Sequence, residues 1–296
     1  MKISHFRHIA LRTPELERSA EFYQDVWGLR LVETIDGSVF LRARSSEHHQ
    51  VELHAGDERR IDHLAFAVPD EAAVADAHRE LVERGVRVLS EPAPLDRPGG
   101  GTGLRIADPD GRVVELSAGV ATHEPIADGI GPHKISHVVL NTPDIDRITD
   151  FYVDVLGFRV SDWSEHQMVF LRCNTDHHSV AFNRAEWAAL NHVAYEVSDI
   201  DDVMRGIGRM KAAGRDLLWG PGRHGPGNNV FAYFQDPAGF VCEYTSEVMQ
   251  IDEDTWQPQV WERRPDLMDR WGTSGPPRPE ARAAMAGSPD PGIGEA

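Results

Sequence analysis

Cysteine, basic charge and long apolar runs are all scarce in this chain of 296 residues. Two cysteines, Cys173 and Cys242, are too few for a disulfide framework, which favours a reducing, cytoplasmic setting. Thirty basic residues against 48 acidic ones give a net charge of −18, which argues against nucleic acid as a partner, because phosphate binding needs clustered Lys and Arg. No apolar stretch approaches the roughly 20 residues of a membrane helix, and no secretory signal is visible, so no membrane contact is expected.

Histidine and internal repetition are what the chain has in excess. It contains 15 histidines, and its hydrophobic content of 41% is enough for a substantial core. Residues 8–31 and 137–160 align at a constant offset of 129, with 11 identities in 24 positions. The match resumes at His63 with His192, at the same offset. The sequence therefore predicts two halves of one design.

Composition divides the chain into five segments. The repeated halves cover 1–120 and 134–249, and a Gly-, Pro- and Ala-rich linker covers 121–133. Residues 250–272 are expected to fold back as a lid over the site of the second half, although a simple C-terminal helix or a subunit contact is the alternative. Residues 273–296 are rich in Pro, Gly and Ala and are expected to form a flexible tail.

Within each half, a short strand, a helix and several strands follow one another twice. The β-branched run Ile135–Leu140 predicts a strand, and Thr142 followed by Pro143 predicts a helix N-cap with proline at the first helical position. Gly157 is expected to end that helix, and a second helix is expected near 199–213. The pattern predicts an α+β fold of four βαβββ modules, two in each half.

Three residues of the second half have the composition of a metal site. His137 and His192 lie in the first strands of successive modules, and Glu243 lies in an apolar last strand, where a carboxylate is costly unless it is paired or bound to metal. Two imidazoles and one carboxylate leave open positions for substrate and oxygen, as in non-haem Fe(II) oxygenases. The spacing alone is also compatible with three unrelated residues, two of them core histidines.

The segment 220–244 reads GPGRHGPGNNVFAYFQDPAGFVCEY and carries a more specific signal. With His224, Tyr233, the pair Asp236-Pro237 and Glu243 in order, it resembles the signature of type I extradiol dioxygenases in the vicinal oxygen chelate superfamily. Ala232 departs from that signature, where a larger apolar residue is usual. The resemblance covers about residues 1–272 and is nearest the homoprotocatechuate 2,3-dioxygenase branch.

The resemblance implies two vicinal oxygen chelate domains, of which the first is non-catalytic, and a specific set of site residues. His137, His192 and Glu243 would bind the metal, His178 would act as acid and base, and Tyr233 and His224 would contact the reacting oxygens. The expected substrate contacts are Trp219, Phe170 and Asn229.

The implied reaction is extradiol cleavage of a catechol-type aromatic diol. Fe(II) is the expected cofactor, although the ligand set also permits Mn(II), and O2 is the co-substrate whose two atoms enter the ring-opened semialdehyde. The resemblance further implies a role in aromatic hydrocarbon catabolism and a homo-oligomer, either a dimer or a tetramer. The alternatives are a glyoxalase-like or isomerase-like metalloenzyme, a hydroquinone-type dioxygenase and a non-catalytic small-molecule binder.

The repeat places an equivalent triad, His8, His63 and Glu115, in the first half. It is a candidate second metal site, with a vestigial, hydrogen-bonded triad as the alternative. The other equivalent positions differ, because Arg105 aligns with Tyr233 and Asp96 aligns with His224. A cationic Arg105 near the triad would repel a metal ion.

The expected ring substituent is apolar or uncharged. In the branch that the chain resembles, an arginine that binds the substrate carboxylate precedes the GPGRH segment, and this chain has Trp219 there. A C-terminal arginine pair of that branch aligns with Leu267 and Met268, although Arg263, Arg264 and Arg270 are close in sequence and another register is the alternative. The alignment predicts an apolar pocket in place of a charged one.

Overall fold

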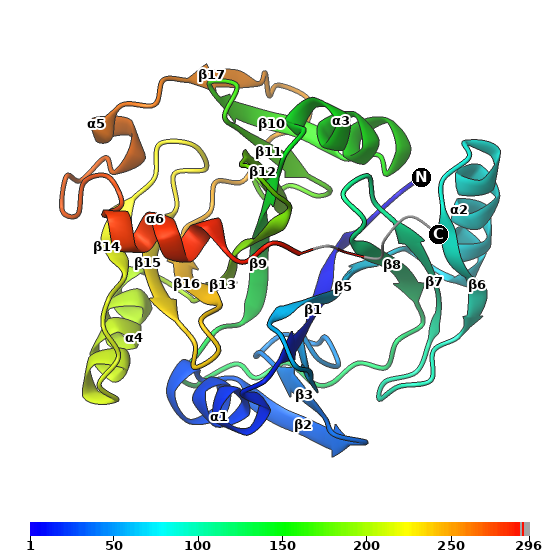
Figure 1. Ribbon diagram of the computed structural model, residues 1–296, viewed down its shortest axis with the longest axis horizontal. Coiled ribbons are helices and arrows are strands. Elements are labelled where there is room, and N and C mark those ends of the chain that lie inside the picture. Colours follow the sequence, from blue (N-terminus) through cyan, green and yellow to red (C-terminus); the bar gives the residue numbers. More distant parts are fainter. Residues whose placement is uncertain (291, 293–296) are drawn as a thin grey trace.

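Two β-sheets form the molecule, and each comes from one half of the sequence (Figure 1). The structure is a computed structural model that describes residues 1–290 and 292. The elements of the first half are β1 (His5–Thr13), α1 (Leu16–Glu21), which continues as the π-helix Phe22–Trp27, β2 (Arg30–Ile35), β3 (Ser38–Arg42), β4 (Val51–Ala55), β5 (Arg60–Ala67), α2 (Glu71–Glu83), β6 (Val88–Pro94), β7 (Thr102–Ala107) and β8 (Val113–Ala118).

The second half repeats this order and adds a C-terminal extension. Its elements are β9 (Lys134–Thr142), α3 (Ile145–Asp150) with the π-helix Phe151–Val155, β10 (Arg159–Ser164), β11 (Met168–Arg172), β12 (Val180–Arg184), β13 (Ala189–Glu196), α4 (Ile200–Ala212), β14 (Trp219–Arg223), β15 (Val230–Gln235) and β16 (Val241–Ser246). The extension contains β17 (Gln259–Trp261), α5 (Pro265–Met268) and α6 (Pro279–Ala286).

Sheet order confirms the four predicted βαβββ modules. The first sheet runs β2-β3-β4-β1-β5-β8-β7-β6, and the second runs β14-β15-β16-β13-β9-β12-β11-β10, with β17 added at its edge. The first strands of paired modules lie side by side and antiparallel in the middle of each sheet, β1 with β5 and β9 with β13. Strands β9, β13 and β16 are therefore neighbours, which brings together residues that lie far apart in sequence.

The start of α3 corrects one sequence prediction. Thr142 is the last residue of β9, paired with Arg184, and the N-cap is Asp144, whose Oδ1 accepts the Arg147 backbone N–H at 3.1 Å. The predicted cap is wrong by two residues because the strand continues through Thr142. Gly157 adopts a φ of 78° just after the helix, a conformation that favours glycine, as a helix end requires.

One continuous hydrophobic core joins the two halves. Trp27 of the first half is fully buried and stacks on Tyr244 of the second half, with ring centroids 3.7 Å apart. The Tyr244 hydroxyl also donates to the Trp27 carbonyl at 2.7 Å. Because Tyr244 follows Glu243 in β16, the contact between the halves supports the strand that carries the candidate metal ligand.

The structure of the C-terminal residues corrects the prediction of a flexible tail at 273–296, because part of this segment forms a helix. Helix α6 lies across the second sheet (Figure 1), its Ala281 is fully buried, and Asn141 Nδ2 donates to the Met285 carbonyl at 2.8 Å. Of the predicted tail, residues 291 and 293–296 lie outside the described residues. Among the residues that the structure describes, no helix is long and apolar enough to cross a membrane.

Candidate active site

The three predicted metal ligands come together at the middle of the second sheet. His137 projects from β9, His192 from β13 and Glu243 from β16, and their ligand atoms all lie within 4.8 Å of one another. Glu243 Oε2 is 3.5 Å from His137 Nε2 and 3.2 Å from His192 Nε2. The fold therefore gathers one carboxylate and two imidazoles around one point.

Neighbouring amides orient two of these ligands. Asn191 Oδ1 lies 2.8 Å from His192 Nδ1, which assigns the ring proton to Nδ1 and leaves the lone pair of Nε2 facing the triad. Asn229 Nδ2 donates to Glu243 Oε1 at 3.4 Å, so the predicted substrate contact Asn229 also holds a metal-ligand candidate. Within the described chain, the buried atoms His192 Nε2 and Glu243 Oε2 have no hydrogen-bond partner, and such orphaned atoms fit coordination to a divalent cation.

The protonation states of the triad also suit a cation. Burial alone would raise the pKa of Glu243, but the imidazoles of His137 and His192 beside it hold that pKa well below its usual range. Burial lowers the pKa of His137, and the charge of Glu243 offsets this only in part. A carboxylate with neutral imidazole neighbours is the form in which these groups bind metal.

A chain of hydrogen bonds leads from His178 to Asp162. His177 Nε2 lies 3.0 Å from Asp162 Oδ2, and the Nδ1 atoms of His177 and His178 are 3.1 Å apart. Because a carboxylate accepts, His177 Nε2 is assigned the proton, and His177 Nδ1 then accepts from His178 Nδ1. His178 Nε2 is left with a lone pair for the pocket, and burial, with His137 and His177 nearby, lowers the pKa of His178 well below its ordinary value.

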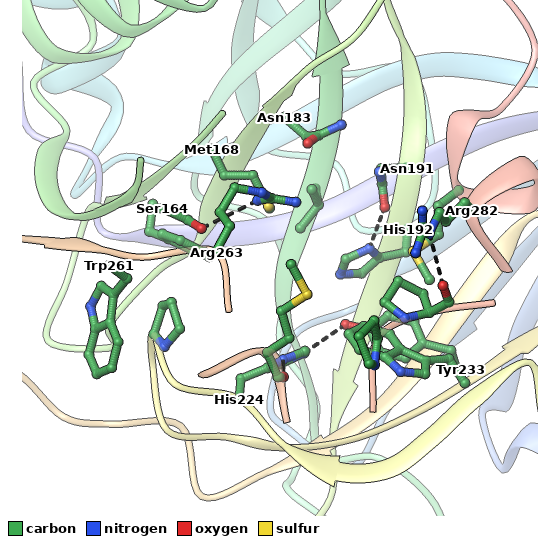
Figure 2. A pocket seen from close by; sticks show the side chains of 18 of the residues that line it. Ser164, Met168, Asn183, Asn191, His192, His224, Tyr233, Trp261, Arg263 and Arg282 are labelled. Carbon is green, nitrogen blue, oxygen red and sulfur yellow. Dashed lines mark hydrogen bonds between the residues drawn. The ribbon is translucent and has the colours of Figure 1, made fainter. Parts of the chain in front are cut away.

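His224 and Tyr233 form a second hydrogen-bonded pair at the pocket (Figure 2). His224 Nδ1 donates to the Met268 carbonyl at 3.0 Å, so its Nε2 accepts from the Tyr233 hydroxyl, also at 3.0 Å. Burial lowers the pKa of His224 to about 4 and raises that of Tyr233 well above its ordinary value. The imidazole is therefore neutral and the phenol is protonated near neutral pH.

The segment predicted as a lid lies along this site. The Gln259 backbone N–H and Trp261 Nε1 donate to the two oxygens of Asp162, at 2.8 and 2.7 Å, while β17 pairs with β10. Gly225 leaves room for the segment, because a Cβ at this position would lie 2.6 Å from the Leu267 carbonyl oxygen. The segment is thus tied to the carboxylate that begins the Asp162–His177–His178 chain.

A cavity of about 570 Å³ opens onto these groups. The predicted residues His137, His192, His178, His224, Tyr233, Trp219, Phe170 and Asn229 all line it. Val139, Phe170 and Met168 give it an apolar wall, and Trp219 stacks on Tyr233 at 5.1 Å. Helix α6 contributes Met285 and Ala286, which sequence reasoning had assigned to a flexible tail.

Two arginines that sequence reasoning did not place in the site also line this cavity, Arg263 and Arg282 (Figure 2). The prediction of a pocket without charge is therefore wrong, although Trp219, Leu267 and Met268 do face it. Arg263 Nη1 donates to Ser164 Oγ at 3.3 Å, and Arg282 Nε donates to the Pro277 carbonyl at 2.9 Å. Neither guanidinium has a carboxylate within 4.0 Å in the part of the chain that the structure describes.

The first half holds its own cluster, but an arginine lies within it. His8, His63 and Glu115 meet as the repeat predicts, with His8 Nε2 2.9 Å from His63 Nε2. Arg97, which sequence reasoning did not single out, donates from Nη1 to Glu115 Oε2 at 2.9 Å and lies 3.2 Å from His63 Nε2. Arg105 also donates to Glu115, at 3.1 Å.

The fold agrees with comparisons to known proteins. Residues 5–116 and 134–244 match the Glyoxalase/Bleomycin resistance protein/Dioxygenase superfamily, and the chain belongs to it. Among curated relatives, Metapyrocatechase 2 of Cupriavidus necator is 30% identical over 91% of this chain and 89% of its own. A manganese-dependent 2,3-dihydroxybiphenyl 1,2-dioxygenase of Geobacillus genomosp. 3 is 27% identical over 88% of this chain and 90% of its own.

Solved structures show the same architecture. A Mn(II)-bound glyoxalase from Novosphingobium aromaticivorans is 40% identical, covers 99% of this chain and 97% of its own, and superimposes with a TM-score of 0.92. Homoprotocatechuate 2,3-dioxygenase from Brevibacterium fuscum, in complex with 3,4-dihydroxyphenylacetate, is 25% identical, covers 95% and 92% of the two chains, and has a TM-score of 0.86. The predicted pair of vicinal oxygen chelate domains is confirmed.

Proposed function

We propose that the chain is an extradiol ring-cleaving dioxygenase acting on a catechol-type aromatic diol. The observation that carries the proposal is the convergence on one cavity of an unsatisfied carboxylate–imidazole triad and a neutral histidine whose free nitrogen faces the same space. Curated relatives that cleave aromatic diols support the activity. The site would hold Fe(II), or Mn(II) as in two of the similar proteins, and would use O2 as co-substrate.

His137, His192 and Glu243 would hold the ion, since their donor set of two nitrogens and one oxygen suits either metal. When bound, the ion supplies adjacent sites for the diol and O2 and lowers the pKa of the diol hydroxyls. The chain's own contribution begins at His178, whose Nε2 can accept a hydroxyl proton and later return it as an acid. At the other wall, the Tyr233 hydroxyl can donate to a reacting oxygen in place of His224, and His224 Nε2 is then free to accept from a hydroxyl.

The two arginines of the cavity wall indicate the charge of the ring substituent. Arg263 and Arg282 are cations on the wall of a largely apolar pocket. Burial lowers the pKa of Arg263, the charge of Glu165 partly offsets this, and the charge of Arg282 lowers it further. An anionic group on the substrate would compensate both charges. We therefore replace the sequence-based expectation of an uncharged substituent with a substrate that carries a carboxylate or a comparable anion remote from its two hydroxyls.

A glyoxalase-type reaction is the second candidate, favoured by the name of the 40% identical structure. The donor set of the triad has a single carboxylate, Glu243, whereas a second carboxylate or a different fourth ligand is expected for that chemistry. His178 and the Tyr233–His224 pair would also be left without a task in a glyoxalase. Both features favour ring cleavage.

The decisive experiment is anaerobic reconstitution with Fe(II) or Mn(II), followed by addition of substrate in air. The panel is catechol, 3-methylcatechol, 2,3-dihydroxybiphenyl and 3,4-dihydroxyphenylacetate, with the hemithioacetal of methylglyoxal and glutathione as the glyoxalase substrate. We expect a yellow ring-opened product, highest kcat/KM for 3,4-dihydroxyphenylacetate, and loss of colour in His192→Ala. Turnover of the hemithioacetal without any yellow product would overturn the proposal. If a neutral catechol proved the best substrate, only the proposal of an anionic substituent would be overturned, and the proposal of ring cleavage would stand.

We further propose a homo-oligomer, a dimer or a tetramer, acting in the cytoplasm. Two free cysteines and apolar side chains exposed at Ile130 and Val260 are compatible with this assignment. Light scattering of the purified protein measures the assembly directly, and a monomer would contradict it.

A further inference from the structure

The two halves hold the same three ligand types on equivalent strands, yet the charges around the two triads differ. His8 on β1, His63 on β5 and Glu115 on β8 repeat His137 on β9, His192 on β13 and Glu243 on β16. Glu243 Oε2 is unpaired by hydrogen bonds among the described residues, whereas both oxygens of Glu115 accept from Arg97.

Two repeat positions account for this difference. At the offset of 128, Arg97 corresponds to Gly225, and at the offset of 129, Glu52 corresponds to Ala181. The first half thus carries a carboxylate and a guanidinium at positions where the second half carries two small residues. Arg97 Nη1 lies 3.4 Å from Glu52 Oε1, so the added side chains meet as an ion pair inside the cluster.

The guanidinium occupies the space that an ion would need. Arg97 Nη1 is 2.9 Å from Glu115 Oε2 and 3.2 Å from His63 Nε2, and the Arg97 side chain is only 8% exposed. A divalent ion bound to the same atoms would sit about 2.0–2.2 Å from them. Ion and guanidinium therefore exclude each other on steric and on electrostatic grounds.

The charges already balance without a metal. Glu52 and Glu115 are buried acids, and Arg97 and Arg105 are the cations that contact them. The carboxylate of Glu243, by contrast, has no lysine or arginine within 4.0 Å in the described chain. A buried carboxylate requires a counter-charge, which the first half supplies from its own sequence and the second half does not.

We propose that Arg97 is a built-in substitute for the metal ion, so that the wild-type chain binds a single divalent ion, in its second half, and keeps a latent metal site in its first half. Removing the Arg97 side chain would open that site to a second first-row divalent ion, held by His8, His63 and Glu115. Glu52 and His49, with His49 Nε2 2.7 Å from Glu52 Oε1, stand beside it as further donors.

The test is metal stoichiometry. Protein loaded with Mn(II) and desalted is measured by elemental analysis, and we expect about one ion per chain in the wild type and about two in Arg97→Ala. Arg105→Ala is the matched control and should stay at about one, since Arg97 remains in place. The double variant Arg97→Ala with His8→Ala should return to about one. Two ions in the wild type, or a folded Arg97→Ala that binds only one, would overturn the proposal.

Loss of Arg97 leaves the negative charges of Glu52 and Glu115 without a full counter-charge, so the metal-free variant should be less stable than the wild type. Arg97→Met, which fills more of the space, is the second variant. Added Mn(II) should raise the Tm of either variant by more than it raises that of the wild type. His192→Ala separates this inference from the proposed function. If His192→Ala binds as much metal as the wild type, the assignment of the metal to the second half is wrong. A gain of one ion on removing Arg97 would still establish the latent site in the first half.

Discussion

At the residue scale, Asp162 is expected to control the basicity of His178. Its carboxylate accepts from His177, which in turn accepts from His178, so its negative charge stabilises the form in which His178 has taken a proton. Asp162→Asn keeps the shape and removes the charge. We expect kcat for the preferred catechol to fall by about 10- to 100-fold, less than the roughly 100- to 10,000-fold contribution of a general base because His178 itself remains, with KM and metal content changed less than about twofold.

The comparison variant is Asp146→Asn, which removes a carboxylate from an exposed pair with His166. Steady-state kinetics across pH and elemental analysis are the measurements. An unchanged kcat in Asp162→Asn would show that the hydrogen-bond chain does not reach the chemistry. Loss of bound metal would instead indicate a structural role for Asp162.

Residues that neither the repeat nor the signature marks were the ones that the sequence did not reveal. The triad His137, His192 and Glu243 could be predicted because repeat and signature mark each member. Arg97 and Arg263 carry no local pattern, since an ion pair or a pocket contact depends on which strands become neighbours. The alignment of Arg97 with Gly225 was the one available signal, because an arginine replaces a glycine just before the matching pairs Pro98-Gly99 and Pro226-Gly227.

A second residue-scale prediction concerns Asp236 in the turn before β16. Burial raises the pKa of Asp236 to about 6, and its Oδ1 accepts from the Phe240 backbone N–H at 2.8 Å. In the first half the equivalent Asp108 has a partner, Arg112, and the repeat puts Phe240 at that position. Asp236 is therefore a buried carboxyl without a cation among the described residues.

The sign follows from a folded-state pKa above the unfolded value. The contribution of protonated Asp236 to the free energy of unfolding is fully present below about pH 4 and is lost as the pH rises through about 6. For a shift of this size the loss is about 3 kcal/mol. In Asp236→Asn this part of the pH dependence should disappear, measured by urea unfolding between pH 4 and 7. The exposed Asp154→Asn should follow the wild-type curve, and parallel curves for Asp236→Asn and wild type would contradict the assignment.

At the element scale, helix α6 is expected to complete the pocket. Its Ala284 and Met285 pack against Phe231, Tyr233 and Val241, and its C-terminal carbonyls accept from Asn141. The Pro-, Gly- and Ala-rich composition suggested disorder because it lacks the periodicity of a self-standing helix. Tertiary packing stabilises this short helix, which has Pro279 in its first turn.

Removal of residues 276–296 should open the cavity and delete Arg282. We expect KM for 3,4-dihydroxyphenylacetate to rise about tenfold or more, as loss of a charge-assisted contact implies, while metal content stays the same. Arg282→Met should reproduce most of the rise in KM for the anionic substrate and little of it for catechol. Equal effects on both substrates would assign α6 a purely structural role.

At the scale of the whole molecule, the shared core should make the two halves unfold together. Trp27 is fully buried in the first half, stacks on Tyr244 and lies edge-on to Tyr195 and Phe234, all from the second half. Trp27→Ala should lower the free energy of unfolding by about 3–5 kcal/mol, the usual cost of emptying a buried aromatic site. Exposed Leu31→Ala, in the same half, should change it by less than about 0.5 kcal/mol.

The cooperativity of that transition distinguishes two views of the duplicated fold. If the halves were independent domains, Trp27→Ala would split urea unfolding into two steps, and the half that carries Glu243 would keep its metal through the first of them. Because Tyr244 stacks on Trp27 and follows Glu243 on β16, we expect one displaced transition and a weaker affinity for Mn(II). Tryptophan and far-ultraviolet signals that change at the same urea concentration, together with release of the metal at that concentration, would establish that the first half supports the second-half sheet.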